Sequence, residues 1–347
     1  MAKLGEVCLL KAGKFVSAND ISPEYNKGLY PCFGGNGIRG YVADYTHDGE
    51  FPLIGRQGAL CGNVNLASGK FHATEHAVVV QPKIEMNVHW LYYALNAMNL
   101  GQYATGAAQP GLAVSKLETL SIEIPNISEQ NKIAQTLYKV EQLVNFRKQQ
   151  LSKLDELVKA RFVEMFGDPV SNPMGWKRVR FDSISENLDS KRVPVTESDR
   201  KDGVYPYYGA SGIVDWINDY IFDEDILLVS EDGANLLMRS TPIAFSVSGK
   251  SWVNNHAHVV RFHDFATQKF IEVYFSLIDI SEYITGTAQP KLNQAKLNTM
   301  LFCWPPLSLQ KQFAAFVERV DQQKQTVQQS LEKLELMKKA LMQEYFG

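Results

Sequence analysis

Residues 126–167, NISEQNKIAQTLYKVEQLVNFRKQQLSKLDELVKARFVEMFG, decide the fold, because their apolar residues recur at alternating steps of three and four. This spacing averages about 3.5 residues, the repeat of a helix that packs along one seam against a partner helix. The seam positions are Leu137, Val140, Val144, Leu151, Leu154, Val158 and Met165, and Arg147 and Arg161 interrupt them. The stretch is therefore predicted to form one long coiled-coil helix.

The same pattern returns 180 positions later, at the C-terminus. Its seam positions are Val317, Val320, Val327, Leu331, Leu334, Leu341 and Tyr345, interrupted by Lys324 and Lys338. Polar seam residues set the register of a coiled coil at some cost in stability, and the two copies carry them at complementary places. This favours pairing of the two helices with each other. The alternative is that each helix packs only on its own domain.

Each helix has a predicted beginning and end. Ser128 and Ser308 follow prolines and are expected to be N-caps. Gly167 and Gly347 close the two copies and are expected to stop the helices.

The globular parts of the chain also form a repeat. The segment Tyr30–Ile38 matches Tyr205–Ile213 at an offset of 175, and Thr105–Pro110 matches Thr285–Pro290 at an offset of 180. The extra five residues lie between Ala234 and His256. Short apolar runs between Gly/Asn turns predict strands, and one helix is expected at 88–98. A repeat of this length indicates a duplicated domain and not a solenoid.

These patterns predict an α+β fold with a pseudo-two-fold internal repeat. Two similar strand-rich domains are separated by two long helices that form an antiparallel coiled coil. The expected boundaries are a first domain at 1–126, a central helix at 127–167, a linker and second domain at 168–306, and a C-terminal helix at 307–347.

Composition limits the class of protein. The chain has 347 residues, of which 45% are hydrophobic and 21% charged, and no apolar run reaches the ~20 residues of a membrane span. The four cysteines are scattered without a C-x-x-C pair, so they are expected to be reduced and mostly buried in a cytosolic protein. A net charge of −3 does not favour nucleic-acid binding by the whole surface, so the placement of the basic residues matters.

Catalytic motifs are missing from the sequence. The segment 34–37, GGNG, lacks the lysine and spacing of a phosphate loop, and no G-x-S-x-G is present. The histidine pairs His72/His76 and His256/His258 have no cysteine or H-E-x-x-H companion, so no metal site is expected. The sequence gives no support for catalysis.

The two halves differ where side chains are expected to be exposed. Arg56-Gln57 stands opposite Glu231-Asp232, as expected for one scaffold that reads two different sequences. The candidate DNA-contacting residues are Asn36, Arg39, Tyr41, Arg56, Gln57, Lys70 and Gln109 in the first half, and Ser211, Glu231, Asp232, Asn235, Arg239, Gln289 and Lys291 in the second. Solvated surface is the alternative for the charged residues. For Gln109 and Gln289, a turn that the glutamine side chain ties down is favoured over base contact, because both halves carry it.

The combination of motifs resembles a known family. Y-P-x-x-G-x-x-G-I, T-G-x-x-Q-P-x-L, I-P-x-x-S-E-Q and D-P-x-x-N-P-x-G-W together resemble the DNA-specificity subunits of Type I restriction–modification systems, over essentially the whole chain. The resemblance implies two target-recognition domains that each read half of an asymmetric, bipartite site on double-stranded DNA. It also implies a prokaryotic, cytoplasmic subunit without catalysis or a bound cofactor of its own.

The resemblance further implies the partners. Two adenine-N6 methyltransferase subunits that bind S-adenosylmethionine dock on the helices, and an endonuclease subunit that uses ATP and Mg²⁺ completes the restriction complex. A seam from Leu137 to Met165 spans roughly 40 Å at 1.5 Å per residue, so the helices are expected to set the unread gap of the site. The alternative hypothesis is an interaction scaffold in which the coiled coil binds a partner and the domains read no DNA.

Overall fold

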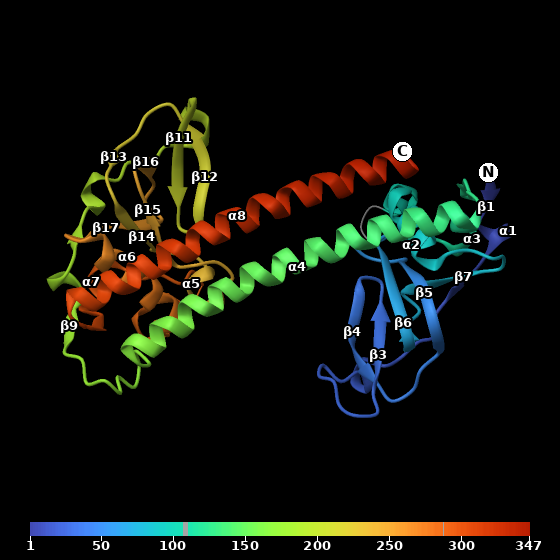
Figure 1. Cartoon of the computed structure of the whole chain (residues 1–347), viewed down its shortest axis with the longest axis horizontal. Helices are drawn as coiled ribbons and strands as arrows, with labels where there is room; N and C mark the ends of the chain where they lie inside the picture. Colours follow the sequence, from blue (N-terminus) through green and yellow to red (C-terminus); the bar gives the residue numbers. More distant parts are fainter. Residues whose placement is uncertain (107–109, 287) are drawn as a thin grey trace. The chain divides into compact units, whose positions relative to one another are not determined.

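A computed structural model describes residues 1–106, 110–286 and 288–347. The chain divides into two compact units (Figure 1). Unit 1 consists of Met1–Arg147 and Ser330–Gly347, and unit 2 of Lys148–Gln329. Each unit therefore holds one strand-rich domain and part of both long helices, α4 (Ile127–Phe166) and α8 (Leu307–Phe346), which have 40 residues each.

The domain of unit 1 is built on a six-stranded sheet in the order β2-β7-β5-β6-β3-β4. The pair β3–β6 is parallel, and the other neighbouring strands are antiparallel. The strands are β2 (Cys8–Ala12), β3 (Tyr30–Gly34), β4 (Gly37–Val42), β5 (His47–Gly55), β6 (Val64–Ala73) and β7 (Ala77–Pro82).

Short elements complete this domain, and the predicted helix at 88–98 is confirmed as α2 (Val88–Ala97). The Asn87 side chain caps α2 by accepting from the Trp90 amide at 2.9 Å. Trp90, Leu91 and Leu95 are buried in the core against the sheet, as their helical spacing predicts. The remaining elements are β1 (Ala2–Lys3), β8 (Ser121–Ile122), α1 (Leu4–Val7), α3 (Val114–Glu118), η1 (Ala18–Asp20) and η2 (Leu100–Tyr103).

The domain of unit 2 repeats this topology in two four-stranded sheets, β10-β17-β14-β15 and β12-β11-β16-β13. The register is repeated too, since Cys32 pairs with His72 and Tyr207 pairs with Trp252 in the parallel ladders β3–β6 and β11–β16. The strands are β10 (Glu186–Asn187), β11 (Asp202–Gly209), β12 (Gly212–Ile217), β13 (Phe222–Asp223), β14 (Ile226–Ser230), β15 (Ala244–Val247), β16 (Lys250–Val253) and β17 (Ala257–Arg261).

The extra five residues of the second half lie in the connection that holds the short helix α5 (Asn235–Met238). Helix α6 (Phe265–Leu277) takes the place of α2. The other elements of unit 2 are β9 (Arg178–Arg180), β18 (Leu301–Cys303), α7 (Gln294–Thr299), η3 (Phe181–Ser183), η4 (Asp189–Lys191), η5 (Glu197–Asp199) and η6 (Ser281–Tyr283).

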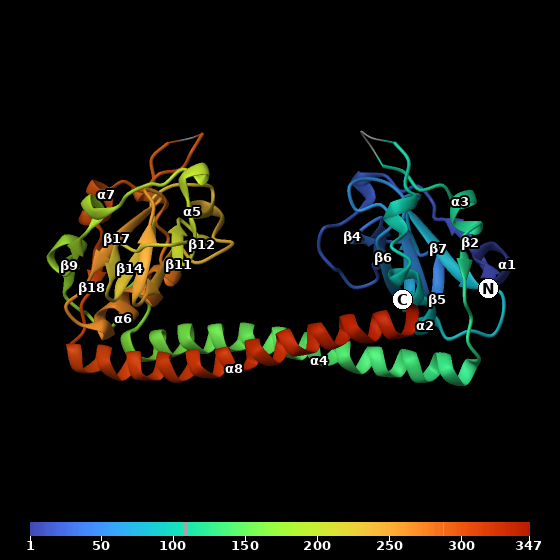
Figure 2. The same cartoon turned by 90° about the horizontal axis from the view of Figure 1, so that it is seen from above.

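Segments of α4 and α8 pair with each other in antiparallel fashion within each unit (Figure 2). In unit 1, Lys338 Nζ lies 2.7 Å from Glu141 Oε1, and Arg147 Nε lies 3.1 Å from Ser330 Oγ. In unit 2, Lys324 Nζ lies 2.6 Å from Asp155 Oδ1. The predicted seam residues are buried or half-buried throughout: Leu137, Val140, Val144, Leu151, Leu154, Val158, Val317, Val320, Val327, Leu331, Leu334 and Leu341.

The predicted N-caps of these helices, Ser128 and Ser308, each lie two residues too far along the chain. Asn126, not Ser128, caps α4, because its Oδ1 accepts from the Glu129 amide at 3.0 Å. Ser308 lies inside the first turn of α8, where the Leu309 amide donates to the Pro306 carbonyl. The glycine stop of α4 is confirmed, since Gly167 adopts a left-handed φ of 78° that favours glycine.

A buried glutamine joins each domain to its helix. Gln130 Oε1 accepts from the Asn87 amide at 2.9 Å, and its Nε2 donates to the Pro125 carbonyl at 2.8 Å. Gln310 repeats this arrangement with Thr267 Oγ1 at 2.8 Å and the Pro305 carbonyl at 2.9 Å. A buried amide whose oxygen and nitrogen are both bonded holds a junction in one geometry.

The four cysteines are free and buried, as predicted. Within the part of the chain that the structure describes, no helix has the length and apolar composition of a membrane span.

Candidate nucleic-acid interface

Four backbone segments meet at one edge of the sheet in unit 1. The Arg56 amide donates to the His76 carbonyl at 3.0 Å, and the Leu112 amide donates to the Arg56 carbonyl at 2.9 Å. Gly35 approaches the same place so closely that a Cβ on Gly55 would lie 2.0 Å from the Gly35 carbonyl oxygen. We call the described residues of 34–37, 55–63, 74–77 and 105–112 the first loop cluster.

Unit 2 repeats these hydrogen bonds one for one. The Glu231 amide donates to the His256 carbonyl at 2.8 Å, and the Leu292 amide donates to the Glu231 carbonyl at 2.8 Å. Thr285 and Lys291 exchange two backbone bonds of 2.8 Å, as Thr105 and Gly111 do. We call the described residues of 209–212, 230–234, 254–257 and 285–292 the second loop cluster. The two clusters share one backbone plan.

The side chains on this common plan differ. The first loop cluster brings together Asn36, Arg56 and Gln57, and Asn36 and Gln57 are exposed. Asn36 Oδ1 accepts from Asn63 Nδ2 at 2.8 Å, which orients the turn between β3 and β4. A basic and amide-bearing surface of this kind suits guanine, adenine or phosphate oxygens.

The second loop cluster brings together Ser211, Glu231, Asp232 and Lys291, and exposed Gln289 lies on the same loop as Lys291. Asp232 accepts from His256 Nδ1, with oxygens at 2.9 and 3.0 Å. Carboxylates suit the amino group of cytosine. At the matched backbone position, the first cluster thus carries the basic Arg56 and the second cluster the acidic Glu231.

Glu231 belongs to a buried group of charges behind the second loop cluster. Arg192 Nη1 donates to Glu231 Oε2 at 2.6 Å, and Lys291 Nζ lies 3.1 Å from Glu231 Oε1. His258 Nδ1 lies 2.6 Å from Asp189 Oδ2, while its Nε2 lies 2.7 Å from the Leu292 carbonyl. Both ring nitrogens thus lie within hydrogen-bond distance of an oxygen, which fixes the orientation of the ring. These contacts tie the loop at Glu231 and Leu292 to η4 and β17.

The same contacts set the ionisation of the two carboxylates. Burial alone would raise the pKa of Asp189, but the hydrogen bond and charge of His258 outweigh it and hold the pKa below its ordinary value. Burial likewise opposes the charge on Glu231, and the hydrogen bond from Arg192 lowers its pKa. One potential metal-ligand atom from each of Asp189, Glu231 and His258 lies within 4.8 Å of the others. These atoms already form ion pairs and hydrogen bonds with one another and with Arg192 and Lys291. We therefore interpret the group as an ion-pair network and not as a metal site.

The other candidate residues lie outside the two clusters or have partners of their own. The Arg39 side chain packs against Gly34. Tyr41 packs edge-on against Tyr25 with ring centres 5.4 Å apart, and the Lys70 ammonium lies over the Tyr45 ring. Gln109 lies outside the described residues.

Asn235 and Arg239 hold the extra segment of the second half together. Asn235 Oδ1 accepts from the Thr241 amide at 3.0 Å. Arg239 donates to the carbonyls of Phe275 at 3.0 Å and Ile278 at 2.9 Å, and burial lowers the pKa of its guanidinium. Both side chains are therefore used within the domain.

Sequence reasoning considered His76 and His256 only as metal ligands, and it missed Arg192. The matching His-Ala dipeptides at 76–77 and 256–257 were the available signal for the two histidines. Arg192 gave no signal, because its partner Glu231 lies far along the chain.

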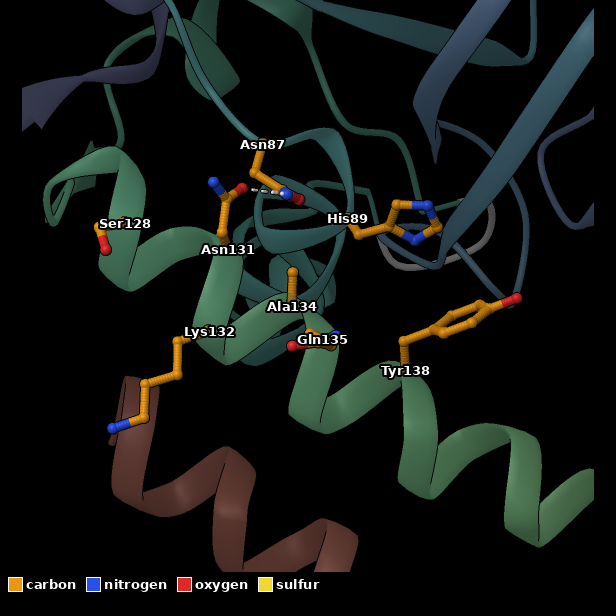
Figure 3. A pocket seen from close by; sticks show the side chains of 8 residues that line it. All are labelled: Asn87, His89, Ser128, Asn131, Lys132, Ala134, Gln135 and Tyr138. Carbon is orange, nitrogen blue, oxygen red and sulfur yellow. Dashed lines mark hydrogen bonds between the residues drawn. The ribbon is translucent and has the colours of Figure 1, made fainter.

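Two surface grooves lie apart from the clusters. The groove of ≈ 540 Å³ in unit 1 lies between the beginning of α2 and the first turns of α4, where Asn87 Nδ2 donates to Asn131 Oδ1 (Figure 3). The groove of ≈ 830 Å³ in unit 2 lies between α5, α6 and the two long helices. Neither is lined by the residues that differ between the clusters.

Comparison with known proteins agrees with this division. The family model described as "Type I restriction modification DNA specificity domain" matches residues 1–156 and 173–336. The Type I restriction enzyme EcoprrI specificity subunit of Escherichia coli is 53% identical over 143 residues, which are 41% of this chain and 36% of that protein. A putative type I restriction enzyme specificity subunit of Haemophilus influenzae is 32% identical over 143 residues, with the same coverage of 41% and 36%. These alignments thus span about a third of either relative.

A solved structure shares the fold over almost the whole length. The crystal structure of a Type I restriction–modification S subunit from M. genitalium has a TM-score of 0.68 at 16% identity, and the match covers 99% of this chain and 95% of that one. The family model covers well over half of the sequence, once in each half. The chain therefore belongs to the family of Type I restriction modification DNA specificity domains.

Proposed function

We propose that this chain reads a bipartite, asymmetric target on double-stranded DNA, one half with each loop cluster. The observation that carries the proposal is the pair of matched backbone clusters with different side chains. Arg56 and Gln57 occupy the backbone positions that Glu231 and Asp232 occupy in the second cluster. A shared scaffold explains how both domains dock on DNA, and the exchanged side chains explain how they prefer different bases.

We further propose that the chain is not an enzyme and serves as a scaffold for adenine-N6 methyltransferase subunits, with endonuclease subunits completing a restriction complex. S-adenosylmethionine would then bind to the methyltransferase, and ATP and Mg²⁺ to the endonuclease. Exposed apolar side chains on the paired helices of unit 1 support a docking role. Tyr138, Leu143 and Phe146 of α4 are 45%, 46% and 58% exposed, and Leu336 of α8 is 68% exposed.

The deciding experiment is co-expression of the chain with the methyltransferase encoded beside it, followed by mapping of modified adenines by long-read sequencing. We expect a two-part motif with a fixed gap, methylated on both strands. An assembled complex that methylates without sequence preference would refute the reading function. It would favour the alternative, an interaction scaffold that binds partners through its helices.

The helices offer a second readout. Removing one heptad from α4 and the facing heptad from α8 takes away about 10 Å of helical rise. We expect the unread gap of the motif to shorten by about 3 base pairs while both half-sites stay the same. A constant gap with altered half-sites would contradict the spacing role of the helices.

A further inference from the structure

One lysine and two tyrosines form a triad at matching positions on the surface of each domain. In unit 1, Lys70 Nζ lies 4.6 Å from the ring centre of Tyr45, and Tyr45 meets Tyr30 edge-on with ring centres 5.0 Å apart. We call Lys70, Tyr45 and Tyr30 the first triad. None of these positions belongs to the first loop cluster.

Unit 2 repeats the geometry closely. Lys250 Nζ lies 4.5 Å from the ring centre of Tyr220, and Tyr220 meets Tyr205 edge-on with ring centres 5.1 Å apart. The tyrosines recur at the offset of 175 and the lysine at 180, as the repeat requires. We call Lys250, Tyr220 and Tyr205 the second triad.

The triads are surface features. Lys70 and Lys250 are exposed, and Tyr45 and Tyr220 are 43% and 36% exposed. An exposed cation over an aromatic ring contributes little to stability, because water solvates the ammonium equally well. Packing alone therefore gives no strong reason for both domains to carry the same triad.

Each lysine has an aspartate as its strand partner, but the aspartate does not pair with the lysine ammonium. Asp48 is the strand partner of Lys70, and Asp223 is that of Lys250. Among the described residues, both ammonium groups lie over tyrosine rings, and neither forms an ion pair within 4.0 Å with its aspartate. The positive charge thus lies over the tyrosine ring and is not neutralised by a carboxylate in direct contact.

The distance between each triad and its loop cluster is similar to the width of the major groove of DNA. Tyr30 begins β3 and Gly34 ends it at the first loop cluster, so the triad lies about 13 Å from the cluster at ~3.3 Å per residue. Tyr205 and Gly209 of β11 have the same separation. The major groove of B-DNA is about 12 Å wide. A triad at this distance from a loop cluster over the base edges can reach the phosphates that flank the groove.

We propose that the two triads are sequence-independent phosphate contacts, one in each domain, that fix the register of the loop clusters on DNA. The proposal rests on the proposed function. Side chains common to both domains do not account for two different half-sites, whereas phosphates are the same at every site. Lysine binds phosphate as a point charge, and the tyrosine hydroxyls are further donors to phosphate oxygens.

The test measures DNA affinity as a function of salt for the full chain in complex with its methyltransferase. One duplex carries the methylated motif, and a second has both half-sites scrambled. We expect Lys70→Gln and Lys250→Gln each to reduce the salt slope by about 0.9 and to weaken binding to both duplexes by the same factor. The methylated motif stays unchanged, and Lys70→Arg and Lys250→Arg keep the wild-type slope.

Matched controls are Lys3→Gln and Lys177→Gln, which remove one exposed charge from each unit away from the triads. Control variants that lower the slope equally would overturn the proposal, since net charge would then explain the effect. An unchanged slope in the triad variants would also overturn it, and so would a change at one half-site only. A lower melting temperature with unaltered binding would make the triads structural instead.

The same measurement separates the two proposals. A wild-type complex that binds both duplexes equally overturns the reading function, while the slopes still decide the phosphate assignment. A wild-type complex that binds neither duplex overturns both.

Discussion

Lys338, which interrupts the apolar seam of α8, places its ammonium 2.7 Å from the carboxylate of Glu141 on α4. The same carboxylate accepts from the Tyr93 hydroxyl at 2.9 Å, and burial raises the pKa of that phenol. Glu141 thus serves a seam lysine and a buried tyrosine at once. The two partners of this ion pair are therefore not equivalent.

Glu141→Leu is expected to lower the free energy of unfolding by about 1–3 kcal/mol, because it leaves the buried Tyr93 hydroxyl without its acceptor. Lys338→Leu is expected to cost less, because it removes one of the two polar interruptions of the α8 seam and leaves the partly exposed Glu141 with the Tyr93 hydroxyl as a donor. Chemical denaturation of both variants measures the difference. Equal losses for the two variants would contradict this account. Lys339→Leu, at an exposed position beside the seam, is the control.

The ion-pair network of unit 2 predicts a dependence on pH. Asp189 and Glu231 have pKa values below the ordinary 3.8 and 4.5. A carboxyl group whose pKa is lower in the folded state than in the unfolded state stabilises the fold at pH values above its ordinary pKa. This stabilisation is lost as the pH falls through the folded-state pKa. Asp189→Asn is therefore expected to cost about 1–3 kcal/mol at pH 7 and to approach the wild type below about pH 4. Thermal unfolding across this range checks it. A cost that stays constant into acid would refute the electrostatic cause.

The loop clusters predict separable effects on the target. Gln57→Ala is expected to relax the half-site read by the first domain only, and Asp232→Asn the half-site read by the second only. Each lost base contact reduces discrimination by about 1–3 kcal/mol. Methylation mapping of the co-expressed complexes gives both half-sites directly. Gln81→Ala and Asp225→Asn, at exposed positions outside the clusters and the triads, are the matched controls. A single variant that altered both half-sites would argue against independent readers.

Arg239 is expected to affect stability and not the target. Its guanidinium donates to the Phe275 and Ile278 carbonyls, so Arg239→Ala leaves two acceptors unpaired. The expected loss is about 1.5–3 kcal/mol in the free energy of unfolding, with the methylated motif unchanged. Denaturation and methylation mapping of the same variant test both parts. A changed methylated motif in a stably folded variant would show instead that Arg239 takes part in reading the target.

Local patterns predicted the elements with little error. Period-3.5 spacing located α4 and α8, and the spacing of Trp90, Leu91 and Leu95 located α2, because a repeating apolar pattern needs only neighbouring residues to be read. The capping error at Ser128 has a local cause as well. Asn126 and Ser128 are both residue types that favour the N-cap position, and the hydrogen bond from the Glu129 amide shows that Asn126 occupies it.

The sequence by itself determined the long helices, the duplicated domain and the positions where the two halves differ, since periodicity and internal repetition are written along the chain. Only the tertiary structure decided which polar side chains face outward. Glu231 turns toward Arg192, Arg239 turns toward Phe275, and Lys70 lies over Tyr45. The direction of a loop side chain depends on partners tens of residues away. Those partners come within hydrogen-bonding distance only when the sheet and its loops have packed.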